Sequence, residues 1–376
     1  MNFDFSESQE MLRDTLSRFL AEKHNLETRR LFLNTDDGRV PGLWRSLASE
    51  LGILGAPFDE SHGGLGGNAV DTMIIMEEFG KALLVEPFVE TVVLCGGILK
   101  RARLEVVKET LAAVIGGEAI LAFAHGEPQM SDSLAAVRTT ARRRGSTYSL
   151  RGRKAVVRAA PWADQLVVSA RTDGDVTERK GISLFLVNAN SPRITLSSYA
   201  TIDGARAADI DLDDVEVPDT HVLGEVGEGL TIVERVADEA IAAICADAVG
   251  CMRSMLLQTI EYASQRRQFG APISSFQVLR HRMVNMYVAL EQAVSMTYCG
   301  TLSLDAGAAE RAKAASAAKV QVGKSCQCVG EGAIQIHGGM GISDELAVGQ
   351  YFKRLTVIRS QFGSTAHHIR RFSSIQ

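Results

Sequence analysis

Arginine, glutamine and phenylalanine lie within four residues of one another at the predicted end of a long helix. The segment Tyr262-Ala-Ser-Gln-Arg-Arg-Gln-Phe-Gly-Ala-Pro places Arg266, Gln268 and Phe269 directly before a Gly-Ala-Pro stop. An arginine fork binds phosphate, a glutamine amide reads a base or ribose edge, and a phenylalanine ring stacks or packs. This combination suits a nucleotide. The alternative is a plain helix hairpin whose terminal cations complement the helix dipole.

A second segment, Gln335-Ile-His-Gly-Gly-Met-Gly-Ile, has three glycines in four residues after a helical pattern. Glycines allow a ligand to approach the backbone closely and leave N–H groups available for phosphate. The spacing matches neither the P-loop nor the dinucleotide-binding glycine pattern. Taken alone, the segment is a glycine-rich turn that either binds an anion or simply reverses the chain.

The elements that must position these segments follow an α, β, α order. Ser6 and Gln9 predict a capping-box start to a first helix, and apolar residues at helical spacing continue to about residue 122. From 121 to 224 the period falls to two, which predicts strands. These strands are expected at 147–152, 165–171, 182–187 and 194–198. Long helical patterns then return at 232–263, 276–304 and 309–336, with a final segment from Asp344.

The predicted fold class is therefore α+β. An N-terminal helical domain is expected over 1–120 and a middle antiparallel β-sandwich or barrel over 121–225. A C-terminal four-helix bundle is expected over 226–376, with helices near 30 residues that provide oligomerisation surfaces.

Composition narrows the class of protein. The 376 residues are 46% hydrophobic and 23% charged with a net charge of −5, which excludes collagen-like and disordered chains and disfavours nucleic acid as a partner. Six cysteines are too few for a disulfide framework and are expected to be reduced core thiols. We expect no membrane span, since no run of about 18 apolar residues occurs. The acidic, amphipathic start does not resemble a signal peptide, which favours the cytoplasm.

Two further features have simple explanations. The basic run from Arg142 to Arg158 lies in strand-like sequence and is expected to be a solvated sheet face; contact with an anionic ligand is the alternative. His337, His367 and His368 have no clustered carboxylate or cysteine near them, so packing or surface roles are expected and no metal site is predicted.

The sequence resembles the acyl-CoA dehydrogenase family over essentially its whole length. The residues that carry the resemblance are FDFSESQEMLRD, HGGLGG, YASQRRQFGAPISSFQ and QIHGGMG. Less specific marks, GISLFLV, YFKRL and Phe362-Gly363, are similar to a small-subunit branch. That branch includes the pimeloyl-CoA dehydrogenase small subunit and subunits of heteromeric steroid-side-chain acyl-CoA dehydrogenases. The resemblance implies FAD shared between subunits. It also implies α,β-dehydrogenation of an acyl-CoA thioester, with a glutamate base and flavin N5 as hydride acceptor.

One half of such a shared site matches the family and the other does not. The resemblance implies that a neighbour's FAD is gripped by Arg266, Gln268, Phe269, Gln277, Gln335, Gly338 and Gly339. The half facing this chain's own flavin departs from the family. The segment from Phe123 to Asp132 is one residue short, with Gly126 in place of a threonine. A Trp-x-Thr is replaced by Val156-Val157-Arg158.

The family's base is also missing. Its two usual positions hold Phe362 and Ala240. Glu239 is a weak candidate for a displaced base, because one residue turns the side chain by about 100° around a helix. The alternative for Glu239 is an ion pair with Arg235, four residues earlier.

These expectations combine into one hypothesis with two alternatives. The chain is expected to be one subunit of an α2β2 acyl-CoA dehydrogenase whose homologous partner carries the glutamate. An acyl-CoA is the expected substrate and electron-transfer flavoprotein the expected acceptor. The first alternative is a self-sufficient homo-oligomer that uses Glu239. The second is a non-catalytic paralogue that binds CoA or acts as a scaffold.

Overall fold

The computed structural model describes residues 4–102, 105–128, 133–343 and 345–375. The chain divides into two compact units. The helical unit consists of Met1–Arg30, Ala69–Leu84 and Ile241–Gln376, and the sheet unit consists of Leu31–Asn68 and Val85–Ala240. Each unit combines segments that are distant in sequence.

Long helices dominate the helical unit. Its longer elements are α1 (Glu7–Lys23), α4 (Ala69–Ala82), α8 (Gln277–Leu302), α9 (Ala308–His337), α10 (Ala347–Ser360) and α11 (Thr365–Ser374), with the 3-10 turn η7 (Gly338–Ile342). Two helices cross the unit boundary, α2 (Leu26–Leu33) and α7 (Gly229–Gln265). The capping box at the start of α1 is confirmed: the Ser6 hydroxyl accepts from the Gln9 N–H, and the Ser6 N–H donates to the Gln9 side chain.

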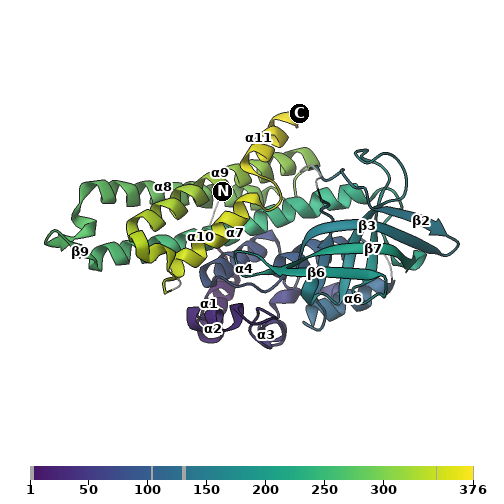
Figure 1. Ribbon diagram of the computed structural model, residues 1–376, viewed down its shortest axis with the longest axis horizontal. Helices are drawn as coiled ribbons and strands as arrows, with labels where there is room; N and C mark the ends of the chain where they lie inside the picture. Colours follow the sequence, from purple (N-terminus) through teal and green to yellow (C-terminus); the bar gives the residue numbers. More distant parts are fainter. Residues whose placement is uncertain (1–3, 103–104, 129–132, 344, 376) are drawn as a thin grey trace. The chain divides into compact units, whose positions relative to one another are not determined.

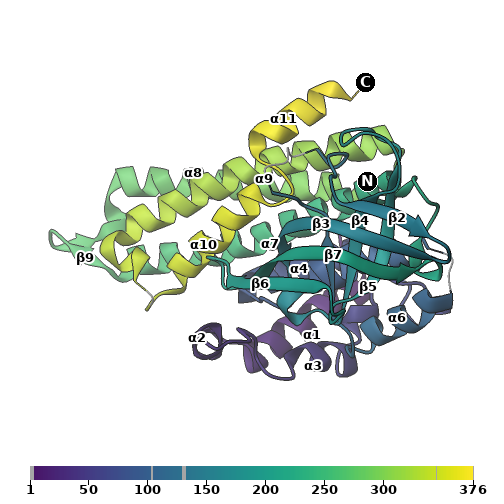
Figure 2. The same cartoon turned by 45° about the vertical axis from the view of Figure 1, so that its right-hand side comes forward.

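The C-terminal bundle has the long helices that the sequence predicts. In Figures 1 and 2, α8, α9 and α10 lie alongside one another, and a small hairpin of β9 (Arg267–Gln268) and β10 (Ala271–Pro272), labelled β9, projects from one end of them. The final segment is two helices rather than one, because the chain turns at Gln361–Gly363; its predicted first residue, Asp344, lies outside the described residues. By length and composition, α7 alone among the described helices could cross a membrane, but 83% of its apolar window is buried, as in a core helix.

The sheet unit is built on one eight-stranded sheet of order β6-β7-β3-β2-β4-β5-β8, with β1 on β4. Its strands are β1 (Leu121–Ala124), β2 (Thr140–Arg144), β3 (Thr147–Arg158), β4 (Gln165–Arg171), β5 (Ile182–Asn188), β6 (Ile194–Ala200), β7 (Arg206–Pro218) and β8 (Val222–Leu223). Most pairs are antiparallel as predicted, but β1 and β2 each pair with β4 in parallel. The apolar core of this unit is built mainly from side chains of the strands, and Leu150, Val168 and Phe185 within it are fully buried.

Short helices complete the sheet unit. They are α3 (Leu43–Ser49), α5 (Gly96–Leu99), α6 (Glu105–Ile115), the π-helix η3 (Val89–Cys95), and the 3-10 turns η1 (Ile53–Gly55), η2 (Glu60–His62), η4 (Ala160–Trp162) and η5 (Asp219–His221). The π-helix carries Glu90.

Candidate functional site

The arginine-glutamine-phenylalanine corner is a tight hairpin, which the sequence did not predict. Strand β9 (Arg267–Gln268) pairs with β10 (Ala271–Pro272), and the two turn residues, Phe269 and Gly270, both have positive φ, at 50° and 79°. Two left-handed residues in a two-residue loop define the turn type that matches the twist of a hairpin. Phenylalanine is strained in this conformation, and its ring is 94% exposed. The turn therefore holds an aromatic ring out in solvent.

Backbone bonds fix the base of this hairpin. The Arg266 N–H donates to Tyr262 O at 2.8 Å, and the Ile273 N–H donates to Arg266 O at 2.8 Å. The Phe269 ring meets Phe276 edge-on with centroids 6.2 Å apart. Within the described chain, the side chains of Arg266, Gln268 and Gln277 are exposed and make no hydrogen bond or ion pair. They are available to an external ligand on a rigid support.

The glycine-rich turn is open to solvent at the residues predicted to meet phosphate. A Cβ added to Gly338 or Gly339 would meet nothing within 4 Å, and Gly338 has a φ of 60°. Gly341 differs, because its Cβ would approach the His337 Cβ at 3.0 Å. Gln335, on the last turn of α9, is exposed. The turn thus has an open backbone surface on one side and close packing on the other.

A ring stack joins the two motifs. Tyr262 and His337 lie with ring centroids 4.3 Å apart and planes within 23° of parallel. His337 is 4% exposed, its Nδ1 lies 3.0 Å from Ala333 O, and burial lowers its pKa. A neutral Nδ1–H donor fits this contact. The packing role expected for His337 is confirmed, and the stack anchors the end of α7 to the end of α9. All seven residues predicted to grip a nucleotide are exposed, and the Tyr262–His337 stack joins the two motifs that carry most of them.

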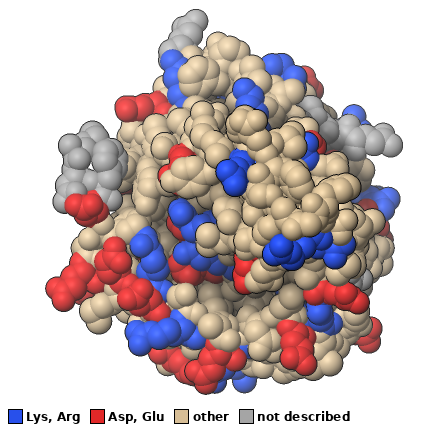
Figure 3. All heavy atoms as spheres, turned by 90° about the vertical axis from the view of Figure 1, so that its left-hand side faces the viewer, with Lys and Arg blue, Asp and Glu red and all other residues tan. Residues whose placement is uncertain are grey.

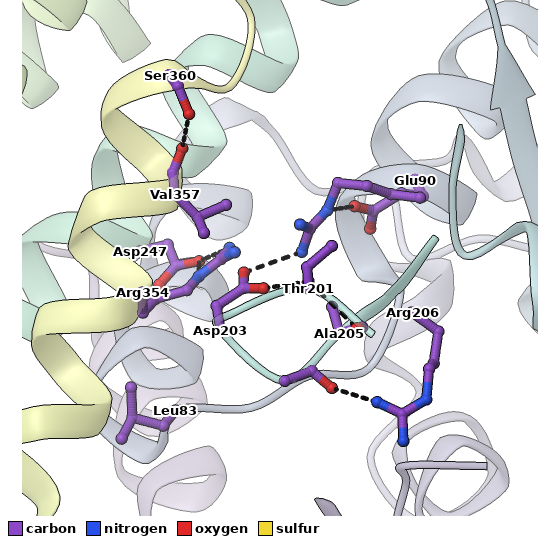
Figure 4. Close-up of polar contacts among 12 residues, drawn as sticks. Leu83, Glu90, Thr201, Asp203, Ala205, Arg206, Asp247, Arg354, Val357 and Ser360 are labelled. Atoms are coloured by element: carbon purple, nitrogen blue, oxygen red, sulfur yellow. Dashed lines mark hydrogen bonds and ion pairs between the residues drawn. The ribbon is translucent and has the colours of Figure 1, made fainter. Parts of the chain in front are cut away.

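The position of the family's flavin-bonding threonine holds Arg158, and this arginine is not free. Its Nε donates to Glu90 Oε1 at 2.9 Å, and its Nη2 donates to Asp203 Oδ2 at 3.2 Å. The Asp203 side chain is only 1% exposed and also accepts from Thr201 Oγ1. Figure 4 shows Glu90 and Asp203 as the two ends of this contact. Two nearly buried carboxylates thus hold one guanidinium, a grouping that we call the Arg158 cage.

Two residues before Arg158, the chain bulges. Val156 has a φ of 53° although it is β-branched, and its side chain is 60% exposed. Asp209 holds this conformation, since its Oδ1 accepts the Val156 N–H at 3.1 Å and the Tyr199 hydroxyl at 3.0 Å. The register of β3 against β7 shifts at this point. The strand therefore presents an aliphatic side chain where the resemblance implies a stacking indole.

A buried lysine supports the part of the chain that comes just before residues 129–132. Lys154 is fully buried, and its Nζ donates to Glu127 at 2.8 Å and to Ser169 Oγ at 3.2 Å. Burial lowers the pKa of Lys154 to about 8, although Glu127 beside it acts in the other direction. His125 lies 2.9 Å from the same hydroxyl, and burial lowers its pKa to about 3. His125 is thus a neutral packing residue at physiological pH. The predicted motif residues Gln129 to Asp132 lie outside the described residues.

The two positions that the resemblance assigns to the base hold Ala240 and Phe362, and the neighbouring Glu239 is already paired. Ala240 is fully buried, and the Phe362 carbonyl accepts from the buried His368 at 2.9 Å. Glu239 lies 2.6 Å from Arg101 and 2.8 Å from Arg235. The ion pair expected for Glu239 is present, with a second arginine added. The Glu239 carboxylate is therefore held in place by two guanidinium groups.

The basic run is paired across the sheet. Its exposed arginines face aspartates of β7 and its following turn at 3.3–4.0 Å, in the pairs Arg143–Asp219, Arg144–Asp214, Arg151–Asp213 and Arg153–Asp209. The expected solvated sheet face is present at these four arginines, whereas Lys154 and Arg158 at the end of the run form buried or nearly buried ion pairs. The cysteines match the expectation of buried core thiols only in part. Four of them are buried, but Cys299 and Cys328 are exposed. No group of three or more His, Cys, Asp or Glu in the described chain could hold a metal ion.

Comparison with known proteins identifies the family. The chain matches the N-terminal, middle and C-terminal domains of acyl-CoA dehydrogenases over residues 6–118, 122–215 and 227–373. It belongs to the acyl-CoA dehydrogenase family, whose members are FAD-dependent oxidoreductases with helical, β-sheet and helical domains, so the predicted fold class is confirmed.

Particular relatives share the whole chain. It is 31% identical to the caffeyl-CoA reductase-Etf complex subunit CarC of Acetobacterium woodii, over 96% of both chains. It is also 31% identical to human short-chain specific acyl-CoA dehydrogenase, over 82% of this chain and 76% of that one. Its fold matches the ChsE4-ChsE5 complex of Mycobacterium tuberculosis with a TM-score of 0.90 at 23% identity, over 100% of this chain and 98% of that chain.

Sequence reasoning missed the residues that complete these sites. Glu90 and Asp203 lie 68 and 45 residues from Arg158, and no local pattern connects them. Tyr262 stood inside the recognised motif, but nothing in its spacing indicated a stack on His337. The sequence did not indicate the tight turn at Phe269 and Gly270, because phenylalanine is not a residue that favours the left-handed conformation needed at its first position.

Proposed function

We propose that this chain is one subunit of a heteromeric FAD-dependent acyl-CoA dehydrogenase. It supplies the half-site that grips the ADP part of its partner's FAD and contributes no catalytic base. The observation that carries the proposal is the contrast between the two half-sites. The hairpin and the glycine-rich turn present exposed donors without partners, joined by the Tyr262–His337 stack. The flavin-facing strand and the base positions hold residues that are paired, buried or aliphatic.

The residues present fit an FAD diphosphate and adenosine on the gripping side. Arg266 provides a guanidinium fork for phosphate, and the open backbone of Gly338 and Gly339 allows close approach of an anion. Gln268 and Gln277 can hydrogen-bond ribose or base edges, and the exposed Phe269 ring can pack against the adenosine. FAD, when bound, supplies the hydride acceptor. The contribution of this chain is to bind and orient the nucleotide, and the proton is removed by a glutamate of the partner.

The flavin-facing side of this chain does not fit a second flavin. The Arg158 cage occupies the position of the hydroxyl that the resemblance assigns to the flavin edge. We therefore propose one FAD per pair of subunits. The heteromer named in the fold match, ChsE4-ChsE5, supports a two-chain assembly. The name of CarC supports electron-transfer flavoprotein as the redox partner. A cytoplasmic acyl-CoA thioester of a dicarboxylic acid or steroid side chain is the proposed substrate.

Flavin content tests this proposal directly. The chain is purified alone and co-expressed with a homologous, glutamate-bearing subunit, and FAD is quantified from its visible absorption. We expect little FAD in the chain alone and about one FAD per pair in the complex, with Arg266→Ala lowering that occupancy at least about tenfold. Stoichiometric FAD and dehydrogenase activity in the chain alone would overturn the proposal.

The two alternatives give different results in the same samples. A self-sufficient homo-oligomer would be yellow and active alone, and Glu239→Gln would abolish its turnover. A non-catalytic scaffold would bind acyl-CoA without FAD in every preparation. The intact gripping residues argue against the scaffold, because without FAD their exposed donors have no ligand to bind.

A further inference from the structure

An aromatic contact lies between the two motifs that are proposed to grip the nucleotide. The rings of Tyr262 and His337 have centroids 4.3 Å apart and planes within 23° of parallel. Tyr262 lies in the last turn of α7, and His337 is the last residue of α9. The contact therefore joins the ends of two helices that are far apart in sequence.

Each ring is tied by short-range contacts to the gripping residues that follow it. The Arg266 N–H donates to Tyr262 O at 2.8 Å, so the hairpin begins on the same turn of backbone that carries the tyrosine ring. On the other side, a Cβ added to Gly341 would come within 3.0 Å of the His337 Cβ, so the glycine-rich turn folds back tightly onto the histidine. A change in the relative position of the two rings is thus transmitted to both motifs.

Packing is the feature that holds the two rings together. His337 Nδ1 lies 3.0 Å from Ala333 O, within its own helix, and the Tyr262 hydroxyl makes no hydrogen bond with the described chain. Among the residues that the structure describes, no ion pair connects 262–273 with 335–342. In Figure 3, which views the molecule from the end where the β9 hairpin projects, uncharged atoms cover much of the surface. Ring packing, and not a polar contact, therefore joins the two motifs.

We propose that Tyr262 and His337 are positioning residues for the FAD diphosphate. Their stack holds the Arg266 hairpin and the open backbone of Gly338 and Gly339 at the spacing at which both bind one nucleotide. This inference rests on the proposed function and deepens it. Two contacts on one ligand reinforce each other only while their spacing matches the ligand, because the second contact then forms within the complex. Loss of the stack should therefore weaken FAD binding, although His337 is only 4% exposed and neither ring is predicted to touch the nucleotide.

The competing explanation is that the stack only stabilises the helical unit, and the same unit offers a control for it. Tyr298 on α8 packs against Phe5 with ring centroids 6.0 Å apart, and that contact touches neither motif. Tyr262 and Tyr298 are both half-buried. Tyr262→Leu and Tyr298→Leu therefore remove the same ring from two aromatic contacts, of which only the first joins the motifs.

The test uses the complex with the glutamate-bearing subunit, stripped of FAD and then titrated with FAD while the flavin fluorescence is followed. Tyr262→Leu and His337→Ala should each raise the Kd for FAD roughly tenfold. The ring-retaining variants Tyr262→Phe and His337→Phe should stay within about twofold of the wild type, and Tyr298→Leu should lower the Tm without changing the Kd. Native mass spectrometry checks that each variant is still assembled. If Tyr262→Leu does not fold, the two His337 variants decide the question.

A double substitution adds a readout that a purely structural role would not move. If the stack acts by holding the Arg266 hairpin in place, Tyr262→Leu combined with Arg266→Ala should weaken FAD binding no more than about twofold beyond Arg266→Ala alone. A loss equal to the product of the two single losses would overturn the inference while leaving the proposed function intact. So would an unchanged Kd in Tyr262→Leu and His337→Ala, or an equal rise in Tyr298→Leu. A wild-type complex that binds no FAD would overturn the proposed function itself, and the inference with it.

Discussion

Replacing Arg158 by alanine should destabilise the sheet unit strongly, because Glu90 and Asp203 would both lose the guanidinium that pairs with them. Its two ion pairs, at 2.9 and 3.2 Å, involve an Asp203 side chain that is 1% exposed and a Glu90 side chain that is 13% exposed. Removing one member of a buried ion pair typically costs about 3–5 kcal/mol, since the remaining charge is buried without compensation. Asp203 keeps its Thr201 contact, so we expect the lower end, about 3 kcal/mol.

Arg153 provides a matched control on the same strand. It also pairs with two aspartates, at 3.3 and 3.7 Å, but its side chain is 54% exposed. Exposed pairs contribute about 0–1 kcal/mol, so Arg153→Ala should have little effect. For a unit of about 200 residues, 3 kcal/mol corresponds to a fall in Tm of roughly 6–12 °C.

The assay is thermal unfolding of both variants at pH 7, followed by circular dichroism. Asp203→Asn in the Arg158→Ala background should recover part of the loss, because it removes one of the two uncompensated charges. If Arg158→Ala costs no more than Arg153→Ala, Arg158 is a weakly held cation that could turn to a ligand. The flavin-facing side of this chain would then not be closed to a second flavin by the Arg158 cage.

Three other predictions concern protons and thiols. Burial raises the pKa of the Glu86 carboxyl from 4.5 to about 7, so its contribution to stability is complete below pH 4.5 and is lost as the pH rises through 7. Between pH 4.5 and 8, the free energy of unfolding in urea should therefore fall by about 3 kcal/mol relative to that of Glu86→Gln. A difference between the two proteins that stays constant with pH would contradict this. Because two arginines hold Glu239, Glu239→Gln should lower the kcat of the complex less than about tenfold, whereas a general base would cost about a hundredfold or more. Ellman's reagent should titrate two thiols in the native chain, Cys299 and Cys328, and all six after unfolding; a native count of four or more would contradict the buried cores.

The helices were predictable because their signals are local. Apolar spacing and a capping box located α1, and the long C-terminal helices begin and end within a few residues of their predicted bounds. The alternation of the strands located β4 and β5 but not the parallel pairing of β1 with β4, because period-two alternation carries no information on strand direction.

The site was predictable only where it is continuous in sequence. The gripping residues occupy two short motifs, so they could be proposed as one group from the sequence, whereas the exposure of the Phe269 ring could not. The Arg158 cage could not, because it joins three segments through long-range ion pairs. Glu239 was predictable in part. Its pairing with Arg235 follows from their spacing of four residues on one helix, whereas its pairing with Arg101, 138 residues away, has no local signal.

The most direct test of the central claim is the FAD-to-chain ratio in the complex with a glutamate-bearing homologue, measured together with the ratio in this chain alone. We expect about one FAD for each pair of subunits and almost none for the isolated chain. Two FAD for each pair, or full occupancy in the isolated chain, would contradict it.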